Sequence, residues 1–148
     1  MLNTDDSKQL REMVRMLERN LVILQDSEFS CCGITMAQCH ALVEIGRSTN
    51  ISLNDLAELI NLENSTMSRT VNNLVINDLV KRDPDPNDRR YVTISLTESG
   101  HRLYESIEDG MNEYFEKVYN AIPENKKQQV LESLQILLDA INKNECCK

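Results

Sequence analysis

The chain has 148 residues, with 24 acidic and 16 basic side chains and a formal net charge of −8. Hydrophobic residues make up 41% of the chain and aromatic residues only 4%, so the core is built mainly from Leu, Ile, Val and Met. No apolar run approaches the roughly 20 residues of a membrane span, and the first residues lack the basic and apolar regions of a signal peptide. We therefore expect a cytoplasmic protein, not a membrane protein, with one domain or one domain and an attached helical module.

The charges are unevenly distributed along the chain. Residues 64–90 carry five basic and four acidic side chains, whereas residues 1–63 carry five and ten, and residues 91–148 carry six and ten. DNA binding depends on the protein's electrostatic field within a Debye length of the binding surface, about 8–10 Å, and not on the protein's total charge. The acidic total therefore weakens a DNA-binding interpretation without excluding it, and only the middle segment is near neutrality.

The first half of the chain predicts helices with one short strand. Residues 4–27 have apolar side chains at three- and four-residue steps, which is typical of a long amphipathic helix. A second helix follows Thr35, a candidate N-cap whose capping-box partner is Gln38, and ends within residues 46–50. Residues 51–53 form a stub of strand. Ser52 or Asn54 then caps a short helix whose inward side chains are Leu56, Ala57, Leu59 and Ile60.

The second half predicts a helix-turn-helix followed by a hairpin. A turn at 61–64 leads into a helix from Ser65 to Leu79, with a buried stripe of Met67, Val71, Leu74 and Val75. Residues 80–82 enter a turn at 83–88 that is rich in Pro, Asp and Asn, and residues 91–96 return as a strand. Thr97 caps a further helix, and Pro123 opens the last one.

This order of elements predicts an all-α fold with a small β-wing, a winged helix-turn-helix. We assign residues 34–97 to a winged helix-turn-helix DNA-binding domain and residues 1–30 and 98–148 to a helical dimerisation region. The long terminal helices would expose large apolar stripes in a monomer. We therefore expect an intertwined helical homodimer.

The second helix of a helix-turn-helix lies in the major groove, and its first residues reach the edges of the bases. Short polar side chains and an arginine, which can bind guanine through two hydrogen bonds, occupy this part of the chain: Ser65, Thr66, Ser68, Arg69, Asn72 and Asn73. The same residues also fit a capped helix with a solvated face.

The turn of the hairpin ends in Asp88-Arg89-Arg90. Arginine suits the negative potential of a narrow minor groove, and Asp88 can hold the guanidinium of Arg90 by a charge-assisted pair. A solvated charged turn is the alternative. The position between two strands, directly after a helix-turn-helix, favours the DNA-binding interpretation.

These motifs resemble those of the MarR (multiple antibiotic resistance regulator) family. The run from Asp83 to Arg90 is similar to the family's Asp-x-Arg wing, and Leu96-Thr97 with Gly100 is similar to its Leu-Thr-x-x-Gly helix start. The resemblance implies a homodimer that binds a pseudo-palindromic operator in double-stranded DNA, with repression relieved by a ligand or by thiol chemistry. It also implies that Arg90 enters the minor groove with Asp88 as its partner. Asp78 stands where the family usually has glycine, but Asn77-Asp78 can still form a left-handed turn.

Five cysteines suggest a second kind of site. Their odd number in a cytosolic chain points to free thiols or metal ligands: Cys31, Cys32, Cys39, Cys146 and Cys147. Thiolates prefer soft metals and metalloids, so these residues form a candidate sensor for oxidants, electrophiles or a thiophilic ion. The spacing matches no standard zinc motif, and Cys39 also fits a small core residue. A small amphipathic effector in the cleft beside the dimer helices, implied by the resemblance, is the competing switch.

Other classes of function fit less well. Cys39 and His40 are adjacent and project about 100° apart on a helix, so they cannot pair as nucleophile and base, and the four glycines form no phosphate-binding loop. We therefore expect no enzyme and no required cofactor. A winged-helix adaptor that binds proteins instead of DNA remains a rival, which the acidic total favours.

Overall fold

The computed structural model describes residues 4–29 and 33–144. The chain forms two compact units, one up to Glu105 and one from Ser106. The boundary lies inside helix α5 (Glu98–Ala121), so this helix carries the chain from the first unit into the second. The predicted division into a winged-helix domain and a dimerisation region stays a prediction.

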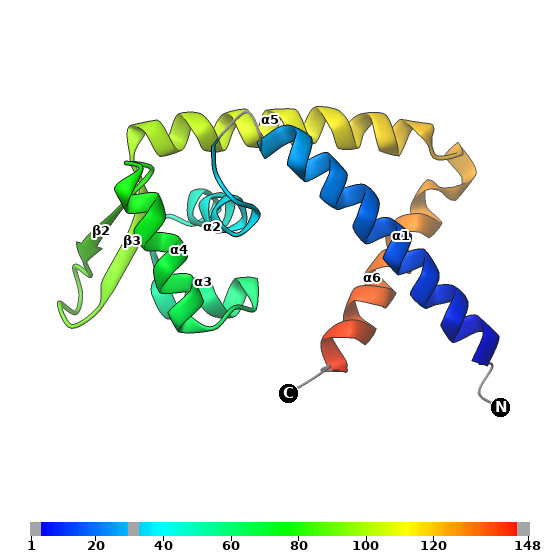
Figure 1. Cartoon of the computed structure of the whole chain (residues 1–148), viewed down its shortest axis with the longest axis horizontal. Helices are drawn as coiled ribbons and strands as arrows, with labels where there is room; N and C mark the ends of the chain where they lie inside the picture. The colour runs from blue at the N-terminus through cyan, green and yellow to red at the C-terminus, as the bar shows by residue number, and fades with distance from the viewer. Residues whose placement is uncertain (1–3, 30–32, 145–148) are drawn as a thin grey trace. The chain divides into compact units, whose positions relative to one another are not determined.

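The first unit has the predicted order of elements. It contains α1 (Thr4–Phe29), α2 (Met36–Arg47), β1 (Ile51–Ser52), α3 (Leu53–Ile60), α4 (Asn64–Ile76), β2 (Val80–Pro84), β3 (Val92–Leu96) and the start of α5. In Figure 1, α2, α3 and α4 lie together, and the hairpin of β2 and β3 extends beyond them as a wing. The predicted all-α fold with a small β-wing is confirmed.

Local hydrogen bonds explain where α2 and α3 begin. The Thr35 hydroxyl accepts from the backbone N–H of Gln38 at 3.2 Å, and the Gln38 side chain accepts from the backbone N–H of Thr35 at 3.2 Å. This is the predicted capping box. Helix α3 is capped by Ser52, whose hydroxyl accepts from the N–H of Asp55 at 3.1 Å, and ends at Asn61 in the left-handed conformation (φ 61°).

The core of the first unit lies between α2, α3, α4 and β3. Its largest fully buried side chains are Leu42, Ile45, Leu56, Met67, Val71, Leu74 and Ile94. The prediction that Leu59 points inward is wrong, because 58% of this residue is exposed. Leu56 and Ala57 define the buried stripe of α3, and Leu59 lies about 160° around the helix from Ala57.

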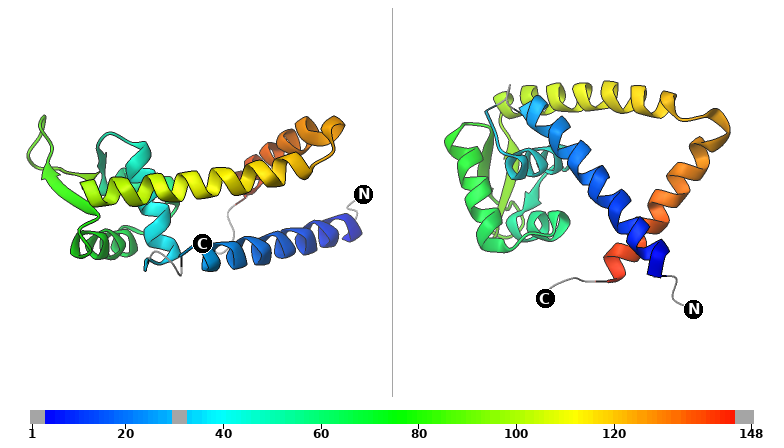
Figure 2. Two further views of the ribbon diagram at one scale, coloured as in Figure 1. Left: turned by 90° about the horizontal axis from the view of Figure 1, so that it is seen from above. Right: turned by 45° about the vertical axis from the view of Figure 1, so that its right-hand side comes forward.

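The sheet has three antiparallel strands in the order β1-β3-β2. Ile51 pairs with Ile94, and Val80 pairs with Leu96, which ties the wing to the core (Figure 2). The returning strand begins at Val92 and not at Tyr91. Tyr91 belongs to the turn, since its carbonyl accepts from Asp85 N–H at 2.9 Å and its N–H donates to the Asp88 carbonyl at 3.1 Å.

Helix α4 ends at Ile76, before the predicted end at Leu79. Asp78 has a φ of 58°, so the predicted left-handed turn at this residue is confirmed. The N–H of Asp78 donates to the carbonyl of Val75 at 3.0 Å, and that of Leu79 to the carbonyl of Leu74 at 2.9 Å. These bonds satisfy carbonyls at the end of the helix and turn the chain into β2.

The second unit contains the rest of α5, the 3₁₀ helix η1 (Glu124–Lys126) and α6 (Lys127–Lys143). Pro123 therefore opens a 3₁₀ turn, closed by Lys126 N–H on the Pro123 carbonyl at 2.8 Å, and not the last α-helix itself. Lys127 pairs with Glu124 at 2.7 Å and lies 5.0 Å from the ring centre of Tyr119, which braces the corner between the two helices. Within the described residues, no helix is both long and apolar enough to cross a membrane.

Candidate nucleic-acid interface

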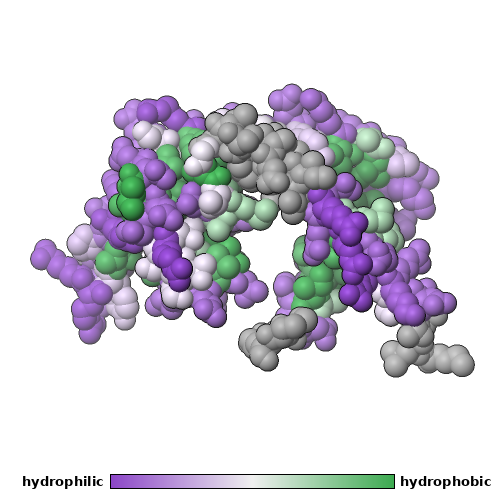
Figure 3. Space-filling model, viewed as in Figure 1, coloured by the Kyte–Doolittle hydropathy of each residue, from purple (hydrophilic) through white to green (hydrophobic). Residues whose placement is uncertain are grey.

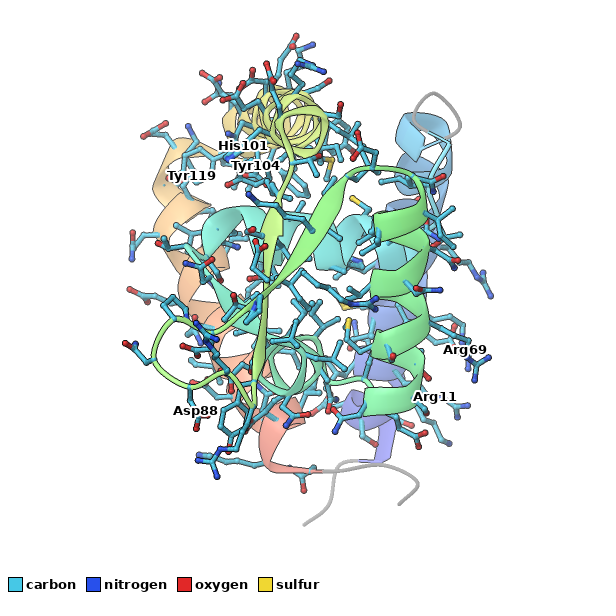
Figure 4. The ribbon with its side chains drawn as sticks, turned by 90° about the vertical axis from the view of Figure 1, so that its left-hand side faces the viewer. Arg11, Arg69, Asp88, His101, Tyr104 and Tyr119 are labelled. Carbon is cyan, nitrogen blue, oxygen red and sulfur yellow. The ribbon has the colours of Figure 1, made fainter. Side chains whose placement is uncertain are left out.

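Helix α4 has one buried face and one polar face. Met67, Thr70, Val71 and Leu74 are buried, at spacings of three and four residues. The six side chains that the sequence assigned to DNA are all exposed: Ser65, Thr66, Ser68, Arg69, Asn72 and Asn73. Figure 4 shows Arg69 pointing from α4 into solvent. The fold therefore gathers these side chains on the outer surface of the helix.

The N-terminus of α4 lacks a side-chain cap. Its N-cap residue is Glu63, which makes no side-chain capping bond, whereas α2 and α3 are capped by Thr35 and Ser52. The first N–H groups of an α-helix have no acceptor within the helix and, with the helix dipole, favour an anion at this end. A phosphate group would supply the missing acceptor.

The loop of the wing, residues 85–91, is held by its own hydrogen bonds. The backbone N–H of Asn87 donates to the carboxylate of Asp85 at 2.8 Å, which forms an Asx turn. Backbone bonds between Asp85 and Tyr91 and between Asp88 and Tyr91 close the loop. The loop therefore presents residues 88–90 from an ordered turn.

Asp88 and Arg90 form the ion pair that the sequence predicted. Arg90 Nε donates to Asp88 Oδ1 at 3.0 Å, Nη2 donates to Oδ2 at 2.8 Å, and the Arg90 backbone N–H donates to Oδ1 at 3.1 Å. These bonds lower the pKa of the Asp88 carboxyl below its ordinary value, and the carboxylate raises the pKa of Arg90. The Arg90 side chain remains 84% exposed, so it is oriented but still accessible.

Three further arginines of the first unit are candidates for phosphate contacts: Arg69, Arg82 and Arg89. Within the described residues, neither Arg69 nor Arg89 forms an ion pair or a side-chain hydrogen bond. The same holds, in this part of the chain, for Arg82, which is exposed on the edge strand β2. Arg82 was not among the residues predicted to contact DNA, although its place in a strand of the wing was a usable signal. All three guanidiniums can bind phosphate without first breaking a protein contact.

The candidate thiol site is only partly visible. Cys39 is buried in α2 with 4% exposure, which fits the core alternative for this residue. Cys31, Cys32, Cys146 and Cys147 lie outside the described residues. In residues 4–29 and 33–144, no three His, Cys, Asp or Glu side chains are grouped so that they could hold a metal ion. A soft-metal or thiol sensor at these cysteines stays a prediction.

Comparison with known proteins connects this geometry with a family. Residues 34–92 match the model of the MarR family. The winged helix of this chain is therefore similar to that of the MarR family. The match contains the polar face of α4 and the Asp88–Arg90 pair, and it confirms the resemblance seen in the sequence.

Named relatives extend the match beyond the winged helix. The HTH-type transcriptional regulator BilQ of Clostridium symbiosum is 25% identical over 122 residues, which cover 82% of this chain and 85% of BilQ. The multiple antibiotic resistance protein MarR of Escherichia coli is 28% identical over 96 residues, 65% of this chain and 67% of MarR. The chain is therefore similar, over most of its length, to proteins that are named as transcriptional regulators.

Solved structures show the same fold. FabT of Streptococcus pneumoniae, crystallised in complex with DNA, superposes with a TM-score of 0.86 at 16% identity, covering 93% of this chain and 98% of FabT. At this identity the likeness concerns the fold alone. The arrangement of helices and wing is therefore one that a solved structure also has.

Proposed function

We propose that this MarR-type regulator binds double-stranded DNA sequence-specifically, as a homodimer on a pseudo-palindromic operator, and acts as a repressor. Each α4 lies in the major groove, and each wing reaches the adjacent minor groove. The observation that carries the proposal is that one compact unit presents both the polar face of α4 and an arginine oriented at the tip of a β-hairpin. The DNA complex of FabT, which has the same fold, supports it.

The two surfaces have different roles in this mechanism. Arg69 can bind O6 and N7 of a guanine through two hydrogen bonds, while the Ser, Thr and Asn side chains beside it donate to or accept from other base edges. Arg90 is engaged with Asp88 through Nε and Nη2, which leaves Nη1 for acceptors in the minor groove. The uncapped N–H groups of α4 bind a phosphate and fix the register of the helix on the duplex.

A second copy of the chain is the partner that covers the exposed apolar side chains of the helices. Exposed apolar side chains on α6 include Leu131, Leu134, Leu138 and Ile141, which are 42–53% exposed. Figure 3 shows hydrophobic residues over this helix. Their steps of three and four residues form a heptad-like stripe, which suits packing against another helix. A twofold dimer also matches two half-sites of an operator.

Binding to labelled duplexes tests the DNA-binding function. Duplexes selected in vitro from random-sequence DNA by the wild-type protein are compared with random duplexes by fluorescence anisotropy over a range of salt concentrations. We expect the affinity to fall steeply with salt, because each phosphate contact releases counterions. A protein-binding adaptor without DNA function would show neither selection nor a salt slope, and that result would reject the proposal.

Two arginine variants separate base readout from general attraction. Arg90→Ala is expected to weaken binding to all duplexes, whereas Arg69→Ala is expected to lower the preference for the selected sequence by about 1–3 kcal/mol. Lys126→Ala removes the same charge from the second unit and serves as the control. If Arg90→Ala binds like Lys126→Ala, Arg90 does not contact DNA and the role assigned to the wing is wrong.

We also propose that an effector or thiol modification releases the DNA. The motivating observation is the pair Cys31-Cys32 in the segment before α2. Oxidant or arsenite is added to the wild-type protein on DNA and to the variant with Cys31→Ser and Cys32→Ser. Release from the wild-type protein alone supports a thiol switch. Identical responses of both proteins would remove these two thiols from the mechanism.

A further inference from the structure

The end of α4 and the start of α5 meet at four residues: Asp78, Leu79, Thr97 and Gly100. We call this group the α4–α5 joint. The Thr97 hydroxyl donates to the carbonyl of Asp78 at 2.6 Å and accepts from the backbone N–H of Gly100 at 3.0 Å. One hydroxyl therefore bridges the loop that ends α4, the proposed recognition helix, and the first turn of α5, the helix that leads into the second unit.

The left-handed conformation of Asp78 makes this bridge possible. With a φ of 58°, Asp78 reverses the chain after α4, and its carbonyl accepts the hydroxyl of Thr97, 19 residues later in the sequence. The N–H groups of Asp78 and Leu79 remain bonded to α4 itself. Movement of Thr97 is therefore transmitted to backbone that belongs to the end of the recognition helix.

Backbone contacts reinforce the same joint. The Thr97 N–H donates to the carbonyl of Leu79 at 3.1 Å. A Cβ on Gly100 would overlap this carbonyl oxygen, so glycine allows α5 to approach the loop closely. Leu79, within the joint, and Leu96, which precedes Thr97, are buried, with 9% and 8% of each residue exposed, so water has little access to this contact.

We infer that Thr97 is a positioning residue that makes α4 and the first turn of α5 move as one body. This inference rests on the proposed function and extends it. Since α5 continues into the second unit, the direction of α5 in a dimer sets the direction of α4. The hydroxyl of Thr97 thereby fixes the half-site spacing that the two recognition helices fit.

Hydrogen exchange of the DNA-free protein tests the joint itself. Thr97→Val removes the hydroxyl and keeps the shape of the side chain, and Thr97→Ser restores the hydroxyl. Thr93→Val removes a matched hydroxyl, which donates to the Asp83 carbonyl at 3.3 Å in the wing. We expect Thr97→Val to speed exchange at Asp78 and Leu79 by about 2- to 10-fold, the effect of one hydrogen bond, although neither N–H bonds to Thr97.

The exchange rates of these variants decide whether α4 and α5 are coupled through Thr97. In Thr97→Ser and in Thr93→Val, the amides of Asp78 and Leu79 are expected to exchange at the same rates as in the wild-type protein. If Thr97→Val changes exchange only at Gly100, whose N–H bonds to the hydroxyl, the two helices are not coupled through Thr97 and the inference fails.

A spacing series tests the consequence for DNA. The duplex selected by the wild-type protein is synthesised with one base pair removed from, or added to, the spacer between its half-sites. We expect Thr97→Val to lose about 2- to 10-fold in affinity for the original spacing and less for the altered spacings, and Thr97→Ser to bind like the wild type. An equal loss on all three duplexes, or no loss, would reject a role in spacing. If the wild-type protein binds no duplex, the proposed function fails, and hydrogen exchange alone decides on the joint.

Discussion

Single residues of the interface follow well from local sequence. The Asp-x-Arg spacing predicted that Asp88 holds Arg90, and the pair forms with contacts of 2.8–3.2 Å. The prediction works because both residues lie in one turn, where two intervening peptide units bring them together whatever the rest of the fold does. The hydrogen bond from the Thr97 hydroxyl to the Asp78 carbonyl did not follow from the sequence, since it spans 19 residues and depends on how the sheet folds.

Asp88→Asn tests whether orientation of Arg90 matters for DNA binding. The variant removes a negative charge, which by itself favours DNA, but it also removes the charge-assisted bonds that hold the guanidinium. We expect the preference for the selected duplex over random DNA to fall by about 2- to 10-fold. Anisotropy titrations measure both affinities. Asp139→Asn, which removes the same charge from α6, is expected to leave the preference unchanged.

The pKa of Asp88 predicts how the difference in DNA affinity between the wild type and Asp88→Asn depends on pH. The Arg90 side chain, followed by its backbone N–H, lowers the pKa of Asp88 in the folded protein. The ion pair between Asp88 and Arg90 is therefore fully formed above the ordinary carboxyl pKa of about 3.9, and it is lost only as the pH falls through the lowered pKa of Asp88. The affinity ratio between wild type and Asp88→Asn is expected to stay constant when titrated at pH 5.0, 6.5 and 8.0. A ratio that declines within this range would contradict an ionised Asp88.

At the scale of elements, periodicity and caps predicted every helix of the first unit. Apart from Leu59, which is exposed and not buried, the errors lie at the ends of the helices. Helix α4 stops at Ile76, because the left-handed Asp78 ends it before apolar Leu79, which looked like one more helical position. Glu124–Lys126 tightened into a 3₁₀ turn before α6. Apolar spacing indicates which residues are buried, but not where the backbone leaves the helix.

Gly100→Ala is predicted to destabilise the first unit. Alanine favours a helix over glycine by about 1 kcal/mol, but its Cβ would overlap the Leu79 carbonyl, which is backbone and cannot rotate away. We expect a net loss of about 1–3 kcal/mol in the free energy of unfolding, as for overpacked cores. Urea unfolding followed by circular dichroism measures it. Ser99→Ala, in the same turn, is expected to change it by less than about 0.5 kcal/mol, and a Gly100→Ala variant as stable as the wild type would show that the joint can open.

At the scale of the whole molecule, the sequence predicted apolar helices that need a partner. No residue of α6 is buried within one chain, and Leu134 is 42% exposed. Hydrophobic periodicity could indicate this surface but not how two copies cross, because the crossing depends on side chains of both chains.

Leu134→Glu is predicted to dissociate the dimer, because a carboxylate in an apolar helix interface loses its hydration without a counter-charge. Light scattering after size-exclusion chromatography is expected to report a dimer for the wild type and a monomer for the variant, with binding to the selected duplex lost in parallel. Gln135→Glu adds the same charge on the neighbouring polar side of α6, where Gln135 bonds to Asp139, and is expected to stay dimeric. A dimeric Leu134→Glu protein would place the interface elsewhere.

The missing cap of α4 has a consequence for the free protein. Glu63 leaves the first amides of α4 without a side-chain acceptor. Under the proposed function, a phosphate of the operator completes the turn. The DNA then supplies the hydrogen-bond acceptor that no side chain provides at this end of α4.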